Sequence, residues 1–201
     1  SNIERTQMGV QQLHASQIKT LPTAVGEVDV LRSLTMLPGG GSAGEASNGL
    51  SVRGGSLDQN LVLLDHAPIF NPTHLFGVFS VFTPDAIAGV ELYKANMPAR
   101  YGGRIASVVD LQVKNAMDQF KLSGGLGFVS SRLAVETPIV ENKLSALASV
   151  RVAHNDFIFR YIERLSNTKA NFQDATVKLN FRASDNDNIQ WTSFFSHDFY
   201  Q

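Results

Sequence analysis

The chain contains no cysteine, which excludes disulfide bonds, thiolate metal ligands and thiol nucleophiles. Long hydrophobic runs are absent as well, because no stretch approaches the roughly 18 apolar residues of a transmembrane helix. Charge is scarce too, with 17% charged residues among 201 and a formal net charge of −1. This balance gives no electrostatic argument for binding nucleic acid, so we expect no nucleic-acid partner.

Motifs of catalysis and metal binding are also missing. The glycine-rich segment PGGGSAGEASNG (residues 38–49) lacks the Gly-Lys-Ser/Thr ending of a phosphate-binding loop, and we interpret it as a mobile loop. No serine has the spacing of a nucleophile elbow. Asp65, His66 and His74 do not form the HExxH pattern of a zinc site. We therefore expect no enzyme, no metal site and no cofactor.

The first part of the chain, residues 3–115, has the mixed pattern of an α+β unit. Apolar residues at helical spacing predict a helix over residues 26–37, which Pro38 ends. A further short turn or helix is predicted at residues 84–86. Strands are predicted over residues 50–53, 60–65, 88–94 and 107–113.

The second part of the chain alternates apolar and polar residues, which predicts strands. These cover residues 120–128, 133–139, 144–151, 175–181 and 189–199. Tight Asn/Asp turns, VENK and ASDNDN, fall at the end of the sheet where the first strand begins, and a long segment falls at the opposite end. Short turns on one rim and longer loops on the other are typical of a membrane β-barrel. A soluble sheet shares the same period, however, and the sequence alone does not say which face meets water.

Several segments carry a family resemblance. They are GEVDVLRSLTMLPGG (26–40), LSVRGGSLDQNLVLLDHAPI (50–69), FNPTHLFGVFSVF (70–82) and VELYKANMPARYGGRIASVVDLQVK (90–114). In this order they resemble the plug domain of TonB-dependent outer-membrane receptors, and SSRLAVETPI (130–139) resembles the start of the barrel in that family. His66 and Thr137 stand where glycine is usual, and Gly39-Gly40 alters the ending of the LPG motif.

The resemblance implies both a fold and a function. Residues 3–115 would be an α+β plug domain, a small mixed β-sheet with short helices. Residues 116–201 would supply about five antiparallel strands of a transmembrane β-barrel. Such receptors are transporters of the Gram-negative outer membrane, with lipid around the barrel and the plug inside its lumen. The plug gates a pore, and TonB in the periplasm drives the import of a scarce or bulky ligand.

We expect the chain to be a truncated fragment, because five strands cannot close the family's barrel of about 22 strands. Ser1-Asn2 resembles a cloning remnant, and the TonB-contacting segment is expected upstream of it. The alternative is a soluble, β-rich carbohydrate-binding or adhesion module with no transport role. The transported ligand is not given by the sequence.

The resemblance also implies roles for single residues. In the family, the arginine of VRG takes part in a charge cluster between plug and barrel, which implies such contacts for Arg53. Further candidates are Lys94, Arg100 and Arg104. The alternative for Arg53 is an arginine that backbone carbonyls hold at a turn. The glycines expected to allow turns and close packing are Gly54, Gly55, Gly102 and Gly103.

Residues 66–80 mix aromatic, amide and imidazole groups in a loop bounded by proline and glycine, which suits a plug loop that faces the ligand. The candidate ligand contacts are Phe70, Asn71, His74 and Phe76. Alternatively, Phe76, Phe79 and Phe82 form part of the plug core, because they are spaced three residues apart. We favour the core for Phe79 and Phe82.

Overall fold

The computed structural model describes a large part of the chain, and every structural statement below refers to that part. The described residues are 10–14, 17, 30–31, 40–42, 50–52, 60–74, 79–93, 107–116, 119–127, 129–154 and 170–200. Within these ranges, no helix has the length and apolar character needed to cross a membrane.

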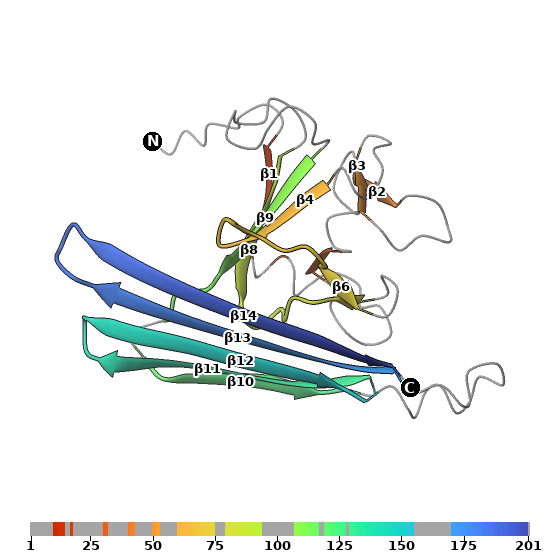
Figure 1. Cartoon of the computed structure of the whole chain (residues 1–201). Coiled ribbons are helices and arrows are strands. Elements are labelled where there is room, and N and C mark those ends of the chain that lie inside the picture. Colours follow the sequence, from red (N-terminus) through yellow and green to blue (C-terminus); the bar gives the residue numbers. More distant parts are fainter. Residues whose placement is uncertain are drawn as a thin grey trace.

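The described residues are mostly in β-strands. The strands are β1 (Val10–His14), β2 (Gly40–Ser42), β3 (Leu50–Val52), β4 (Asn60–Leu64), β5 (Ala67–Pro68), β6 (Thr73–His74), β7 (Phe79–Ser80), β8 (Ile87–Tyr93), β9 (Ser107–Val113), β10 (Lys121–Leu126), β11 (Ser130–Val140), β12 (Leu144–Ala153), β13 (Ala170–Arg182) and β14 (Asn188–Tyr200). The N-terminal sheet has the order β1-β8-β9-β4-β5, and the C-terminal sheet has the order β10-β11-β12-β13-β14 (Figure 1). Two short pairs, β2-β3 and β6-β7, complete the described strands.

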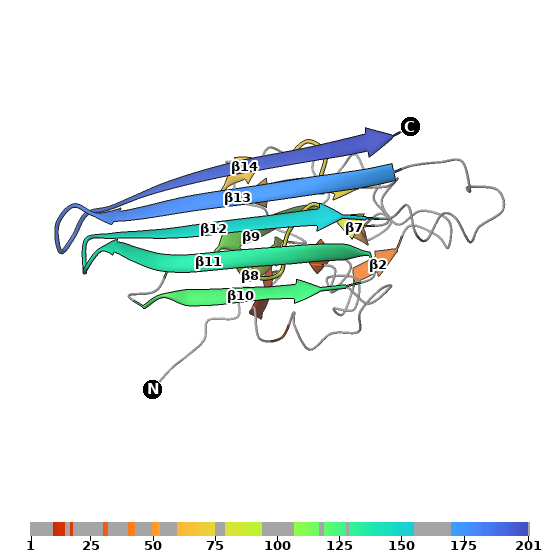
Figure 2. The same cartoon turned by 90° about the horizontal axis from the view of Figure 1, so that it is seen from below.

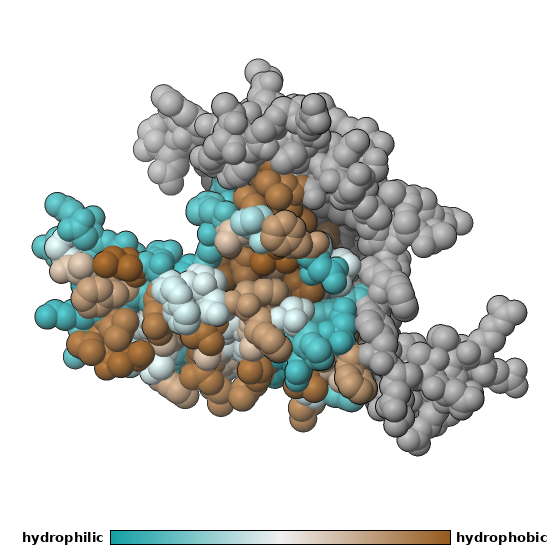
Figure 3. All heavy atoms as spheres, viewed as in Figure 1, coloured by the Kyte–Doolittle hydropathy of each residue, from teal (hydrophilic) through white to brown (hydrophobic). Residues whose placement is uncertain are grey.

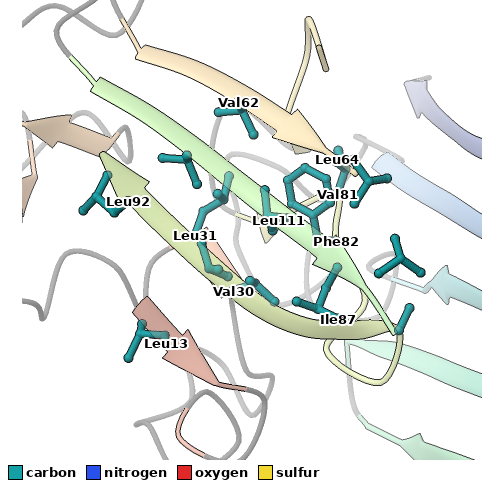
Figure 4. Close-up of a cluster of buried hydrophobic side chains, with 14 of the residues drawn as sticks. Leu13, Val30, Leu31, Val62, Leu64, Val81, Phe82, Ile87, Leu92 and Leu111 are labelled. Carbon is teal, nitrogen blue, oxygen red and sulfur yellow. The ribbon is translucent and has the colours of Figure 1, made fainter. Parts of the chain in front are cut away.

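The N-terminal sheet is mixed, because β4 runs parallel to β9 while the other pairs are antiparallel. Its central strand β9 is buried along nearly its whole length. Around it lies one apolar core, in which Leu92, Val109 and Leu111 are fully buried (Figure 4). Burying such a side chain contributes about 1.5–3 kcal/mol. Leu147 of β12 belongs to the same core, so the C-terminal sheet covers one side of it.

The four strands predicted in the first part are confirmed, each within one residue at either end. The predicted turn at residues 84–86 is also confirmed, because Ala86 N donates to Thr83 O at 3.0 Å. Of the predicted helix, only Val30 and Leu31 are described; both are helical and buried. The prediction of a loop over residues 38–49 is wrong at residues 40–42, which form strand β2 and pair with β3. Strand β1 has too short a pattern to be predicted and adds to the sheet edge beside β8.

The turn between β4 and β5 shows how His66 occupies a place where glycine is usual in the family. Asp65 and His66 have φ values of 46° and 69°, as both central residues of a type I′ turn require. The His66 backbone N donates to Asp110 Oδ1 at 3.3 Å, and its Nδ1 lies 2.5 Å from Asp110 Oδ2. The side chain of Asp110 is fully buried, so these bonds hold His66 in the left-handed conformation.

The C-terminal sheet is a series of antiparallel hairpins, and the five strands predicted for it are confirmed (Figure 2). The turns after β11 and β13 lie at the end of the sheet where β10 begins, as expected (Figure 1). Asn142 supplies a positive φ of 57° in the first turn. In the second turn, Ser184 Oγ donates to Asp187 Oδ2 at 2.8 Å. Thr137, the other departure from the family pattern, precedes a register shift in β11 between Pro138 and Val140.

The two faces of the C-terminal sheet have the opposite polarity to that of a water-soluble sheet. The inner face, toward the N-terminal sheet, carries buried charged residues such as Arg151, Asp174 and Lys178. The outer face carries apolar side chains that are exposed. These include Leu133, Val150, Val152, Val177, Phe181, Trp191, Phe195 and Phe199. Figure 3 shows apolar side chains along the lower side of the molecule, where this sheet lies.

Candidate functional site

The interface between the two sheets is the candidate functional site, because it gathers most of the buried charges of the described residues. The antiparallel register sets these charges in rows across the inner face. One row joins Arg132 of β11, Arg151 of β12 and Asp174 of β13. The next charged row contains Glu136 of β11 and Lys178 of β13. The N-terminal part of the chain contacts both rows.

His74 of β6 contacts the inner face through both of its ring nitrogens. Its Nε2 lies 2.6 Å from Asp174 Oδ1, and its Nδ1 hydrogen-bonds with Asp198 Oδ1 of β14. The ring stacks on Phe172 with 4.1 Å between centroids, and the residue is only 1% exposed. Both ring nitrogens of His74 are therefore held by carboxyl groups of the C-terminal sheet.

Arg151 completes this group from β12. Its Nε and Nη2 donate to Asp174 Oδ2 at 2.9 and 2.5 Å, and Nη2 also donates to Ser80 O at 2.5 Å. Its guanidinium lies 4.9 Å from the centroid of the Phe172 ring. We call His74, Arg151, Asp174 and Asp198 the His74 cluster. Its basic and acidic side chains are in direct contact, which offsets part of the cost of burying them.

A second contact is made by Lys178 of β13, which is 3% exposed. Its Nζ donates to Val113 O at 2.9 Å and lies 3.0 Å from Asp65 Oδ2. Asp65 also accepts from Thr192 Oγ1 of β14 at 2.5 Å and from Val113 N at 2.9 Å. Lys178 therefore joins strand β13 of the C-terminal sheet to the β4–β5 turn and to the end of β9.

A third contact is made by Arg132 of β11, whose Nε donates to Asp85 Oδ2 at 2.7 Å. The guanidinium lies over Gly125 of β10, where an added Cβ would be 3.1 Å from Arg132 Cζ. Glycine at this position therefore leaves the room that the arginine occupies. Lys114 Nζ donates to Asp85 O at 2.6 Å and lies 3.9 Å from Glu136 Oε1, which places opposite charges together here as well.

The contacts at His74, Lys178 and Arg132 can hold the N-terminal part of the chain on the C-terminal sheet. Each of them brings a basic and an acidic side chain together across the interface. Beside the Lys178 contact lies a cavity of about 430 Å³, which Asp65, His66, Thr192 and Phe194 help to line. None of the four residues of the His74 cluster lines this cavity. Among the described residues, no group of three potential ligands is arranged to hold a metal ion.

The residues predicted to face a ligand differ in their exposure to solvent. Phe70 is 96% exposed and Asn71 is also exposed, so both are accessible, and their contact with a ligand stays a prediction. His74 is buried, and both its nitrogens are engaged by carboxylates. Phe76 lies outside the described residues. Phe82 is 2% exposed and lies in the core as favoured above, while the assignment of Phe79 stays a prediction.

The residues predicted for charge contacts between plug and barrel lie outside the described part of the chain. They are Arg53, Lys94, Arg100 and Arg104, and the same holds for the turn glycines Gly54, Gly55, Gly102 and Gly103. Their roles stay predictions.

The charged residues that do meet across the interface were not predicted from the sequence. The signal for Arg132 and Lys178 was their alternation with apolar residues, which places them on one face of a strand. That alternation does not say which face meets another domain. For Asp65 and Asp85 on the other side, no local pattern marks a partner far along the chain.

The N-terminal part of the chain matches a known family. The model of the TonB-dependent Receptor Plug Domain matches residues 2–109. The chain belongs to the TonB-dependent receptor family. The plug thus contains His74, Asp65 and Asp85, and the family is one of transporters and not of enzymes. No curated protein sequence matches the chain.

Solved structures show the same fold. The siderophore receptor PirA from Acinetobacter baumannii is 19% identical, with a TM-score of 0.67 over 96% of this chain and 32% of its own. FpvA from Pseudomonas aeruginosa, bound to heterologous pyoverdines, is 13% identical, with a TM-score of 0.69 over 96% and 26%. The outer membrane transporter YddB from Escherichia coli is 14% identical, with a TM-score of 0.68 over 96% and 33%. The chain thus spans a third or less of these structures, and the likeness includes the C-terminal sheet as well as the plug.

Proposed function

We propose that the chain is the plug and the first wall strands of an outer-membrane receptor, in which the plug gates a TonB-driven pore. The whole receptor imports a scarce or bulky ligand, and the C-terminal sheet is the start of its barrel. The domain boundary lies near residues 115–116, between the end of β9 at Val113 and the start of β10 at Lys121. PirA is described as a siderophore receptor, and FpvA is described as bound to pyoverdines; the ligand of this chain is left open.

The observation that supports this function is the polarity of the C-terminal sheet. Its inner face is charged and meets the plug, while its outer face exposes Val177, Phe181 and Trp191 to an extent of 37–55%. Alternation of this sense is what a barrel wall in lipid requires, with apolar side chains toward the bilayer and polar side chains toward the lumen. The alternative, a soluble binding module, is disfavoured because its sheet would bury these apolar side chains and solvate the charged ones.

Within this function, TonB in the periplasm and membrane lipid are the partners, and the outer membrane is the location. The tight turns after β11 and β13 are assigned to the periplasmic rim, because short turns occupy that rim in such barrels. The exposed Phe70 and Asn71 are assigned to ligand contact, together with Phe76. Arg53, Lys94, Arg100 and Arg104 are assigned to further plug–wall contacts.

Gating is tested without knowledge of the ligand by deleting residues 3–115 from the full-length receptor. We expect cells that produce the deleted receptor to become sensitive to vancomycin, because an unplugged barrel leaves a water-filled pore. Cells with the intact receptor at equal outer-membrane level are the control and should stay resistant. Equal resistance of both strains would contradict a gated pore.

Binding of the purified periplasmic domain of TonB to the intact receptor, measured by calorimetry, tests the energy-coupling partner.

A further inference from the structure

The inner face of the C-terminal sheet contains buried polar atoms that have no hydrogen-bond partner among the described residues. Three of them are Oε1 of Glu136, Oγ of Ser123 and Oγ of Ser149. Glu136 is only 1% exposed and Ser149 only 2%. Burying a polar atom without a hydrogen bond costs free energy, so such atoms nearly always have a partner in a folded protein. These three atoms therefore indicate a partner other than the described protein atoms.

The strand register places the three residues next to one another. Ser123 of β10 and Ser149 of β12 lie on either side of Ala134 of β11, in one row across the sheet. Glu136 is the next residue of β11 on the same face, so each serine is its diagonal neighbour. Diagonal neighbours lie about 7–8 Å apart, within reach of a long side chain. Ala134 carries only a methyl group, so no wall side chain fills the space between the two serines.

Glu136 faces a basic side chain of the plug without bonding to it directly. Its Oε1 lies 3.9 Å from Lys114 Nζ, which is too long for a hydrogen bond. Lys114 Nζ donates to Asp85 O at 2.6 Å. A separation of this size between two opposite charges suits a bridging water, which accepts from the ammonium group and donates to the carboxylate.

A polar cavity of about 350 Å³ lies beside this group, at the end of the sheet with the tight turns. The exposed Arg182 helps to line it, so the cavity is open to solvent. Asn115, Ser145 of β12 and Asn180 of β13 also line it, and Asn180 Oδ1 is a further buried atom without a partner. Ser145 is a diagonal neighbour of Glu136. The polar lining of the cavity therefore continues to Glu136 and gives water a way into the interface.

We propose that a hydrated seam runs between the plug and the wall along β10, β11 and β12. It begins at the cavity, passes Glu136 and ends at Ser149 and Ser123. Its waters satisfy these buried polar atoms and bridge Glu136 to Lys114 of the plug. This inference goes beyond gating, because it concerns the interface itself and depends neither on the transported ligand nor on TonB.

Direct contacts border the hydrated seam. Arg132 donates to Asp85 on one side, and Leu147 packs into the apolar core of the plug on the other. Between these contacts the plug rests on the wall through water. Separation of the plug from this strip therefore breaks few direct bonds, because water continues to satisfy the polar atoms of the wall.

The waters are observed directly in a crystal structure of the full-length receptor, at a resolution that shows ordered water. We expect one water within hydrogen-bond distance of both Glu136 Oε1 and Lys114 Nζ, and another at Ser149 Oγ. The apolar core around Leu92 and Val109 is the internal reference and should contain no water. A Glu136 carboxylate without water, or bonded directly to another side chain, would overturn the proposal. The proposed transport function would still stand.

The direction of a mutational effect provides an independent test in the full-length receptor. In a dry interface, Glu136→Leu would remove a carboxylate without a partner, and the urea concentration at which the plug unfolds would rise. In a hydrated seam, the same change removes the water bridge to Lys114, so we expect this urea concentration to fall. Glu136→Gln should lower it less, because an amide still forms hydrogen bonds with water.

The variant Glu141→Leu is the matched control, because Glu141 is an exposed glutamate in the turn that follows β11. It should unfold at the same urea concentration as the unmodified protein. A urea concentration that rises or stays the same in Glu136→Leu overturns the proposal. If the Glu136 variants do not fold, the waters in the crystal structure of the unmodified receptor decide the question.

Discussion

At the scale of single residues, Lys178 shows how the wall positions the plug. Its ammonium group is removed from water, which costs free energy, and Asp65 and the carbonyl of Val113 offset that cost. Such a buried pair contributes little net stability compared with an apolar substitute. It does specify one arrangement, because the charge is satisfied only when the β4–β5 turn and the end of β9 lie beside β13.

Substitution of Lys178 by methionine is expected to destabilise the docked plug by about 3–5 kcal/mol, because Asp65 is then left without its cation. The measurement is the urea concentration at which the plug unfolds in the full-length receptor. The double variant Asp65→Asn/Lys178→Met should recover part of the loss, since no charge then remains unpaired. Lys143→Met, in an exposed turn, is the control and should change little. A loss in Lys143→Met equal to that in Lys178→Met would contradict the assigned role.

At the scale of elements, β13 has two environments on alternate residues. Asp174, Thr176 and Lys178 are buried against the plug, whereas Val177 and Phe181 are exposed on the outer face. A slip of one residue in the register would exchange the two sets. The thirteen residue pairs between β13 and β14 oppose such a slip, and the tight turn after β13 sets where the pairing begins.

Arginine at Val177 should interfere with membrane assembly if this face meets lipid. Near the bilayer midplane an arginine on the lipid face of a strand costs about 2–4 kcal/mol. We expect less folded receptor in the outer membrane, measured by the heat-dependent shift in gel mobility of the full-length protein. Asp185→Arg, in the exposed turn between β13 and β14, is the control and should assemble normally. Equal assembly of the two variants would show that Val177 does not face lipid.

At the scale of the whole molecule, the 201-residue chain combines a well-packed plug with a sheet that is covered on one face only. The plug has a continuous apolar core, to which Leu147 of the sheet contributes. The outer face of the sheet has no cover among the described residues, and its exposed apolar side chains extend over all five strands. Contiguous apolar surface of this kind usually marks a membrane or protein contact.

We therefore expect the isolated chain to associate in water and to become monodisperse in detergent. Size-exclusion chromatography with light scattering, with and without a mild detergent, provides the measurement. A variant with lysine at Val150, Val177 and Phe195 is the comparison, and it should depend less on detergent because its outer face is more polar. A stable monomer of the unmodified chain in water, with this face protected, would contradict the barrel assignment of the C-terminal sheet.

Much of the fold was predictable from local patterns. Alternation located β10–β14 and the central strands of the plug, and Asn/Asp turns located the hairpin ends. The exceptions have physical reasons. Strand β2 consists of glycine and serine, which carry no strand pattern, and it forms because β3 pairs with it. The turn at His66 lacks the usual glycine and depends on Asp110, a residue far along the chain.

The sequence by itself determined the strand pattern, the turns and the family of the plug. It also determined the separation of charged from apolar residues along each wall strand. All of these depend on residues that are neighbours in the chain. Only the tertiary structure decided which face of the wall meets the plug. It also decided that Asp65, His74 and Asp85 meet Lys178, Asp174 and Arg132. The physical reason is that the cost of a buried charge depends on its partner, and the fold brings these partners together from distant parts of the chain.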